Sequence, residues 1–387
     1  MVKYFICVIS ILLFGSSLHA QQNKIPTQWV ATFCPKPGDC GSLHHVMVAE
    51  DGKLYTWAPG EEAELLPFLD HVVAVSSRTF FILALKDDGT VWAWGDNNNG
   101  QLGNPDYVKK PHSDLFVQVV GLDHVKAISA INSTVGQTCY ALKDDGTIWS
   151  WGSSALGMLG DGAPLVGRYS SSHPTRPVQV KGITNAIAVS GAMALLKDGT
   201  VWTWGDGTYG RLGNGTTTHT STPAPVPGIS NVIAISSRDD GALVLLKDGT
   251  VWAWGNNIKG QVGPQGNVSK TALDKTYNTS PIQVTGITNA IAIDANAVCL
   301  ALLKDGTVKA WGWGAVGGVG RGRPGQNDFN SVPTVVPKVL NVVAIKAGNG
   351  YGFAVEKDGT IMGWGADMVK TGVYHQTWTP VVVGHRK

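Results

Sequence analysis

Two groups of side chains in this sequence have types and spacings that could do chemistry. His44 and His45 are adjacent imidazoles that could ligate a metal ion, but no third ligand follows at a spacing typical of metal sites. The stretch from Asp96 to Gly100 is similar to a calcium loop, yet it lacks the terminal glutamate and stands where the chain must turn. The sequence contains no Gly-x-Ser-x-Gly elbow, His-Glu-x-x-His motif or phosphate-binding loop. We therefore expect no catalysis, no metal site and no cofactor.

Residues 1–20 have the pattern of a secretory signal peptide. Lys3 precedes an apolar run from Phe5 to Phe14, and small and polar residues follow as far as Ala20. Because the apolar run is too short to span a bilayer, we expect cleavage near Ala20 and a mature chain without a membrane span. A retained anchor is the alternative. The leader is typical of bacteria, which predicts a secreted or periplasmic protein.

The cysteines beyond the leader are of two kinds. Cys34 and Cys40 flank a short loop, and an oxidising compartment favours a disulfide between them, with metal binding as the alternative. Cys139 and Cys299 lie in apolar runs at equivalent places of a repeated unit. For these two we expect buried free thiols that pack as small apolar side chains.

That repeated unit organises the chain. In the copy at 194–215, two β-type runs are joined by Asp198-Gly199, a pair that favours a type I′ hairpin turn with positive φ at both residues. A tryptophan stands six residues after the aspartate in every copy, so we interpret the aspartates as turn formers and the tryptophans as core. The aspartates are Asp51, Asp88, Asp145, Asp198, Asp248, Asp305 and Asp358, and the tryptophans are Trp57, Trp94, Trp151, Trp204, Trp254, Trp311 and Trp364.

This repeat predicts an all-β fold, a seven-bladed β-propeller. Successive tryptophans are 37 to 57 residues apart, which suits one small sheet per repeat and exceeds the length of a solenoid coil. An apolar run precedes each hairpin, and a proline-containing strand precedes most of these runs, which gives about four antiparallel strands per blade. The first repeat has no proline strand, whereas 378–383 is such a strand with no repeat after it. We therefore predict that 378–383 joins the N-terminal blade and closes the ring.

Length and charge narrow the possible functions. A repeat protein builds its core between neighbouring units, so we expect one domain over 21–387, as a monomer. The chain has 30 basic and 28 acidic side chains, which leaves no basic excess for binding nucleic acid.

Residues that differ between copies predict where the protein binds. The turn before each hairpin and the Gly-rich turn after each tryptophan vary from repeat to repeat, and aromatic and arginine residues on such loops often anchor interfaces. Phe80 and Phe81 could instead continue their strand into the core. The predicted binding residues are Arg78, Phe80, Phe81, Tyr209, Arg238, Asp239, Asn349 and Tyr351.

The unit Ala-Leu-x-x-Asp-Gly-Thr-Val-x-x-Trp-Gly, followed by Gly-Gln-Leu-Gly, resembles the repeat of the regulator of chromosome condensation family over about 28–383. The resemblance implies a seven-bladed propeller. The leader and the style of 245–255 are similar to secreted bacterial members, such as propeller-type inhibitors of β-lactamases, whose loops form the binding face. The family also includes a plant ultraviolet-B receptor, but the turns of this chain lack that receptor's tryptophans.

We therefore predict a secreted or periplasmic, non-catalytic propeller that binds an unidentified protein partner through one loop-decorated face. Two alternatives remain open. Exposed asparagines and tyrosines, together with Trp378, suggest a glycan-binding module of the cell envelope. The family's nuclear exchange factor suggests regulation of a host small GTPase, which would require delivery into a host cell.

Overall fold

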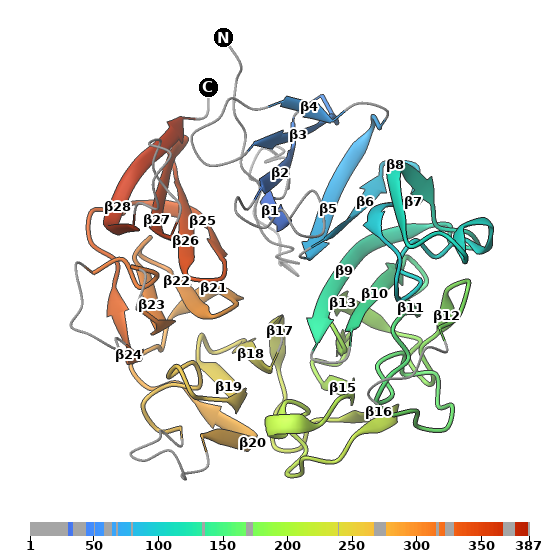
Figure 1. Cartoon of the computed structure of the whole chain (residues 1–387). Helices are drawn as coiled ribbons and strands as arrows, with labels where there is room; N and C mark the ends of the chain where they lie inside the picture. Colours follow the sequence, from blue (N-terminus) through green and yellow to red (C-terminus); the bar gives the residue numbers. More distant parts are fainter. Residues whose placement is uncertain are drawn as a thin grey trace.

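The structure is a computed structural model, and it describes residues 30–33, 44–49, 51–57, 64–66, 69–78, 80–133, 136–167, 173–238, 240–266, 276–314, 317–321, 329–366 and 376–385. The signal-peptide prediction for 1–20 and the predicted disulfide between Cys34 and Cys40 lie outside these residues. Within the described part the fold is all-β, as predicted, with seven four-stranded antiparallel sheets. Figure 1 shows the sheets set around a common centre, as in a seven-bladed propeller.

Each sheet takes four strands that are consecutive in the chain, and we call each sheet a blade. The first blade contains β1 (Val30–Phe33), β2 (His44–Val48), β3 (Leu54–Trp57) and β4 (Glu64–Leu66). The second contains β5 (Val72–Arg78), β6 (Phe81–Lys86), β7 (Val91–Asp96) and β8 (His112–Gln118). The third contains β9 (Val125–Ser133), β10 (Gly136–Lys143), β11 (Ile148–Gly152) and β12 (Val178–Gln179).

The remaining four blades follow the same order. The fourth contains β13 (Ala186–Val189), β14 (Met193–Leu196), β15 (Val201–Gly205) and β16 (Thr220–Pro225). The fifth contains β17 (Val232–Arg238), β18 (Gly241–Leu246), β19 (Val251–Asn256) and β20 (Tyr277–Gln283). The sixth contains β21 (Ala290–Ala295), β22 (Val298–Leu303), β23 (Val308–Trp313) and β24 (Phe329–Val335), and the seventh β25 (Val342–Ala347), β26 (Tyr351–Glu356), β27 (Thr360–Ala366) and β28 (Gln376–His385). Two short 3₁₀ helices, η1 (Pro105–Tyr107) and η2 (Thr208–Gly210), lie in loops.

The Asp-Gly pairs do form the hairpin turns, but the turn type differs from the prediction. Only the glycine has positive φ, for example 78° at Gly89, whereas Asp88 is not among the positive-φ residues. The Asp88 Oδ1 atom accepts hydrogen bonds from the amide of Thr90 at 2.9 Å and from its hydroxyl at 2.6 Å. The predicted type I′ turn is therefore wrong: the aspartate stabilises the turn through its carboxylate and leaves the left-handed conformation to glycine.

The prediction that 378–383 joins the N-terminal blade is also wrong. The C-terminal strand β28 pairs with β27, so it is the outer strand of the seventh blade, and the first blade completes its own sheet with β4. The reason lies in the phase of the repeat. A proline-containing strand such as β16 pairs with the hairpin strand before it, so it ends a blade and does not begin the next one.

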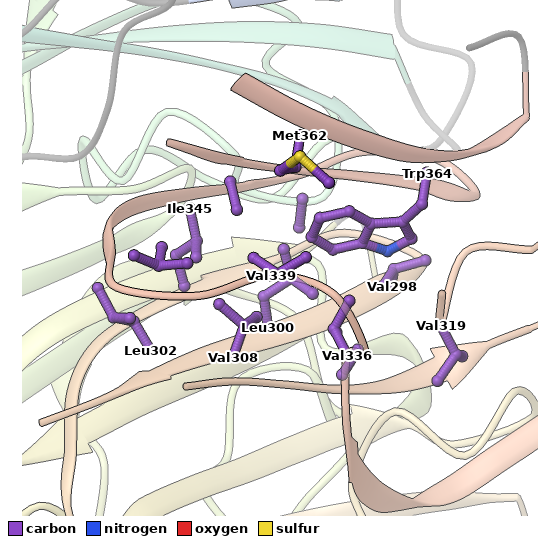
Figure 2. Close-up of a cluster of buried hydrophobic side chains, with 14 of the residues drawn as sticks. Val298, Leu300, Leu302, Val308, Val319, Val336, Val339, Ile345, Met362 and Trp364 are labelled. Atoms are coloured by element: carbon purple, nitrogen blue, oxygen red, sulfur yellow. The ribbon is translucent and has the colours of Figure 1, made fainter. Parts of the chain in front are cut away.

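The core lies between neighbouring blades. Figure 2 shows one such cluster, in which Trp364 of β27 lies among aliphatic side chains of the sixth and seventh blades. Cys139 and Cys299 occupy equivalent places in two other clusters and are fully buried free thiols, which confirms that prediction. Apolar burial between sheets is therefore the main force that holds the blades side by side.

A tryptophan hydrogen bond repeats at five of the blade junctions. The buried indole N–H donates to a backbone carbonyl in the Gly-rich turn of the preceding blade, and we call this contact the tryptophan clamp. It satisfies a polar group that would otherwise be buried without a partner. The pairs are Trp151 with Gln101, Trp204 with Met158, Trp254 with Arg211, Trp311 with Gln261 and Trp364 with Gly318, at 2.8 to 3.1 Å.

A second polar contact joins the innermost strands around the centre, and we call this set of hydrogen bonds the inner ladder. In the second to sixth blades, a side-chain oxygen near the end of the first strand accepts a backbone amide of the next blade. The links run from Ala130 to Ser76, Gly191 to Ser129, Ser237 to Ser190, Ala295 to Ser236 and Ala347 to Asp294, at 2.7 to 3.0 Å. The equivalent residue of the seventh blade is Lys346, whose ammonium group lies 3.1 Å from Asp294 and has no oxygen to accept the next link.

Candidate binding face and groove

The strand order places both sets of variable loops on one face. Because the strands are antiparallel and consecutive, the turn between the first and second strands and the loop between the third and fourth lie at the same edge of each blade. The amide of Asp96 donates to the carbonyl of Phe80 at 2.9 Å, and that of Asn256 donates to Asp240 at 2.9 Å, which joins the two kinds of loop directly. We call this side of the ring the loop face. The Asp-Gly hairpins lie on the opposite side.

Three of the predicted binding residues lie in the interior, so their assignment as surface anchors is corrected. Phe81 begins β6 and packs in the core cluster that contains Trp151, with no exposed surface. Tyr351 begins β26 and makes an edge contact with Phe353, with ring centroids 5.6 Å apart. In both cases the aromatic ring continues its strand into the core, because the second strand of each blade is buried on both sides.

Arg238 is the third buried residue. Its Nη2 atom donates to the carbonyl of Trp254 at 3.1 Å and to that of Asn256 at 3.4 Å, and its Nη1 atom lies 3.8 Å from Asp240. The side chain therefore folds back beneath the loop face and joins the end of β17 to the end of β19. Sequence pattern alone does not distinguish an arginine that reaches outward from one that binds the carbonyls of its own blade.

The other predicted binding residues are distributed over the loop face. Tyr209 is 42% exposed, Asn349 is exposed in a bend before β26, and Phe80 is half-buried in its turn. Arg78 ends β5, and only its backbone is described. Asp239 lies outside the described residues. Tyr209, Asn349 and Phe80 belong to different blades, so they mark separate points on the face.

A buried carboxylate organises the loop that carries Tyr209. Asp206 Oδ1 accepts the amide of Thr208 at 2.9 Å and its hydroxyl at 2.6 Å, while Oδ2 lies 3.2 Å from Arg211 without an aligned hydrogen bond. Burial opposes ionisation, but the charge of Arg211 and the hydrogen bonds from Thr208 outweigh it, so the pKa of Asp206 is lowered. The carboxylate is therefore charged and holds the start of the loop in place.

His219 completes the base of this loop. Its Nδ1 atom lies 3.0 Å from the amide of Gly207 and 3.2 Å from Asp206 Oδ1. Because an amide can only donate, Nδ1 accepts the hydrogen bond from Gly207. Arg211 is the permanent cation that balances the carboxylate.

Beside Tyr209 is a groove of about 620 Å³ between the fourth and fifth blades. One wall is the loop segment 215–218, and the other is the outer strand β20, against which η2 packs. Tyr277 lines the groove and contacts Tyr209, with ring centroids 6.2 Å apart and planes inclined by 59°. The lining residues are Gly215, Thr216, Thr217, Thr218, Tyr277, Asn278, Thr279, Ser280 and Ile282.

Most of this groove was missed by sequence reasoning, which identified Tyr209 alone. The run Thr216-Thr217-Thr218 and the sequence Tyr277-Asn278-Thr279-Ser280 are both rich in hydroxyl groups, but 58 residues lie between Thr218 and Tyr277. Their juxtaposition follows from the packing of neighbouring blades. A composition signal was present in each stretch, and only the strand order shows that the two form one site.

The described residues offer hydrogen-bonding and aromatic surface on this face. They contain no group of three or more His, Cys, Asp or Glu side chains arranged to hold a metal ion. None of the helices described is long and apolar enough to cross a membrane. The fold and the tryptophan clamps together define a β-propeller whose variable loops share one face.

Comparison with known proteins identifies the repeats of this propeller. The model of the regulator of chromosome condensation (RCC1) repeat matches residues 88–132, 198–245 and 248–297, and a second model of that repeat matches 72–101 and 232–261. These matches show RCC1 repeats within residues 72–132 and 198–297 of the chain, as the resemblance predicted.

The similar curated proteins are longer than the shared segment. The chain is 29% identical over 210 residues to the E3 ubiquitin-protein ligase HERC2 of Homo sapiens, a match that covers 46% of this chain and 4% of the relative. It is 28% identical over 223 residues to the RCC2 homologue of Danio rerio, covering 48% and 44%. The chain thus spans less than half the length of these two relatives.

Solved structures share the fold. Prp20p of Saccharomyces cerevisiae, the yeast RCC1, superposes with a TM-score of 0.68 at 22% identity, covering 83% of this chain and 80% of that one. Human WBSCR16 gives a TM-score of 0.67 at 21% identity, covering 84% of each chain. At these identities the likeness shows a common fold.

Proposed function

We propose that this protein is a non-catalytic propeller that binds another protein through its loop face. The observation that carries the proposal is the strand order, which gathers every variable loop at one side of a ring held rigid by the tryptophan clamps and the inner ladder. Variable loops on a rigid scaffold are the usual place of recognition. The yeast relative is described by its binding to Gsp1p and histones, which supports protein binding as a use of this fold.

Capture experiments test this proposal. The mature chain is immobilised and exposed to secreted and envelope proteins, beside a variant with Phe80→Ala and Asn349→Ala on the loop face. The matched control carries Lys247→Ala and Lys304→Ala, two residues beside Asp-Gly hairpins on the opposite side. We expect the same protein to be captured by the wild type and the control and to be lost from the loop-face variant. Capture that is equal for all three would contradict binding through this face.

We further propose that the protein acts outside the cytoplasm as a secreted or periplasmic protein. The leader pattern of residues 1–20 supports this, and so does the style of the repeat shared with secreted bacterial members. Expression of the full chain in a bacterium, followed by osmotic-shock fractionation, tests the proposal. We expect the shocked fluid to contain a chain whose first residue lies close after Ala20. A chain that stays in the cytoplasm with Met1 intact would contradict it.

A further inference from the structure

We propose that the groove between segment 215–218 and β20 binds a neutral oligosaccharide. This goes beyond the proposed function, because it assigns a second class of ligand to a particular part of the loop face. The groove has a volume of about 620 Å³, within the range of about 300–1,000 Å³ typical of small-ligand sites.

The lining chemistry points to an uncharged ligand rich in hydroxyl groups. Threonine, serine and asparagine supply six of the nine lining residues, and none of the nine is charged. A hydroxyl group both donates and accepts, so such a surface can pair with sugar hydroxyls in either direction. A phosphorylated or acidic ligand would need a cation to balance its charge, and the described lining residues provide none. The groove is therefore suited to a neutral sugar chain and unsuited to an anion.

Two tyrosines supply the apolar surface that a sugar also requires. A pyranose ring has hydroxyl groups around its edge and C–H groups on its faces, and the C–H faces stack on aromatic rings. Tyr277 lines the groove, and Tyr209 is 42% exposed beside it. At the equivalent turn of the third blade, Leu156 has nearly the same positive φ, 55° against 59°, but is only 8% exposed. The positive φ is therefore a property of this turn in both blades, whereas the exposed aromatic ring is present in the fourth blade and not in the third.

The groove is formed before any ligand binds. The amide of Gly215 donates to the carbonyl of Thr279 at 2.8 Å, which ties the two walls together. Thr216 donates its hydroxyl to Asn214 at 2.9 Å, and its own oxygen lies 3.2 Å from the amide of Thr218, so the threonine run has a fixed shape. Asp206 holds the other end of the same loop. A preformed site loses little conformational entropy on binding, which favours recognition of a flexible sugar chain.

Calorimetric titration of the full mature chain tests the proposal. The probes are maltohexaose, cellohexaose and N-acetylchitohexaose as neutral chains, with hexagalacturonate as the charged comparison. We expect at least one neutral hexaose to bind, with hexagalacturonate much weaker. Tyr277→Ala should lower the affinity at least about tenfold, since one aromatic anchor commonly dominates such a contact. Tyr277→Phe keeps the ring and should stay within about threefold of the wild type.

Two further variants keep the test decisive if Tyr277→Ala fails to fold. Tyr209→Gly suits the positive φ of that turn and removes the second ring, so it should bind more weakly while unfolding at a similar temperature. Phe329→Ala removes an aromatic ring that is 52% exposed on β24, outside the groove, and should bind as the wild type does. The proposal is overturned if no neutral hexaose binds, if hexagalacturonate binds equally well, or if the folded Tyr209→Gly variant keeps full affinity. Since these variants differ from those of the capture experiment, each proposal fails on its own result.

Discussion

Asp206 shows how one buried side chain shapes a loop on the binding face. It accepts two hydrogen bonds from Thr208 and balances the charge of Arg211, and the loop that follows carries Tyr209 and one wall of the groove. It directly follows the Trp204-Gly205 pair and was not among the predicted site residues. Burial and the ion pair, which only the packed blade shows, give it a larger role.

We predict that Asp206→Asn lowers the free energy of unfolding by about 3 kcal/mol at neutral pH, because the largely buried guanidinium of Arg211 loses the carboxylate that lies 3.2 Å from it. The folded pKa lies below the unfolded value of about 3.9, so this stabilisation is present above that value and is lost as the pH falls through the folded pKa. Urea unfolding of both proteins between about pH 3 and pH 7 measures this. A difference that stays constant down to about pH 3 would show that the charge of Asp206 contributes nothing.

Cys139 and Cys299 give a second prediction at this scale. Burial raises the pKa of the Cys299 thiol to about 12 and that of Cys139 well above its usual value. Because the thiolate is the reactive form, we expect iodoacetamide to leave both residues unmodified in the folded protein at about pH 8 and to label them fully in denaturant. Peptide mass spectrometry reads the two sites separately. Rapid labelling of either site under native conditions would contradict its burial.

At the scale of elements, the tryptophan clamp gives the tryptophan six residues after the aspartate a structural role in five of the seven repeats. The ring fills the space between two blades, and its N–H binds a carbonyl of the preceding blade at five junctions. The tryptophan two residues earlier, such as Trp252, is half-buried and donates to Thr250 within its own blade. The later tryptophan therefore stabilises the junction between two blades, and the earlier one stabilises the hairpin of its own blade.

We predict that Trp254→Phe lowers the free energy of unfolding by about 1–3 kcal/mol, because the carbonyl of Arg211 loses its buried donor and the junction loses volume. The matched change Trp252→Phe, on the same strand, should have an effect below about 1 kcal/mol, since its donor group binds a hydroxyl near solvent. Denaturant titration followed by circular dichroism gives both values. Equal losses for the two variants would argue against the clamp.

The strands and hairpins could be predicted from the sequence because their signals are local. Each Asp-Gly pair with its flanking apolar runs specifies a hairpin without reference to the rest of the chain. The sequence could not predict which blade each proline-containing strand joins. A strand such as β16 lies between two hairpins, and the repeat length is the same whether it pairs with the hairpin before it or with the one after it. For the same reason, the burial of Arg238 and the lining of the groove could not be predicted, because their contacts depend on how the strands pack and not on local composition.

At the scale of the whole molecule, the seventh blade is complete in itself. The strand β28 covers the outer edge of β27, and the first blade has its own four strands. Figure 1 shows the first and last blades as neighbours in the ring. In the inner ladder, the amide of Ala347 in the seventh blade donates to Asp294 of the sixth. The equivalent position of the seventh blade holds Lys346, whose side chain cannot accept a hydrogen bond. Among the described residues the ladder therefore has a direction, and its last link joins the sixth blade to the seventh.

We predict that deletion of residues 376–387 exposes the edge of β27 and leaves the pairing of β1 to β3 intact. Hydrogen exchange followed by mass spectrometry should show lost protection in the peptides that cover β26 and β27, with the first blade unchanged from the full chain. If the peptides of the first blade lose their protection instead, β28 would have to pair there, and the strand order given above would be wrong.

The tryptophan clamp also bears on how many blades such a ring can have. Each of the third to sixth repeats supplies one half of a clamp in its tryptophan and one half of another in its Gly-rich turn, so these copies carry interchangeable contacts. Such contacts do not fix the number of blades, because a duplicated or deleted inner unit would leave the same contacts between neighbours. The count of seven must then be set by the wedge angle at which neighbouring sheets pack, and chains of this type can gain or lose a unit in evolution without inventing a new contact.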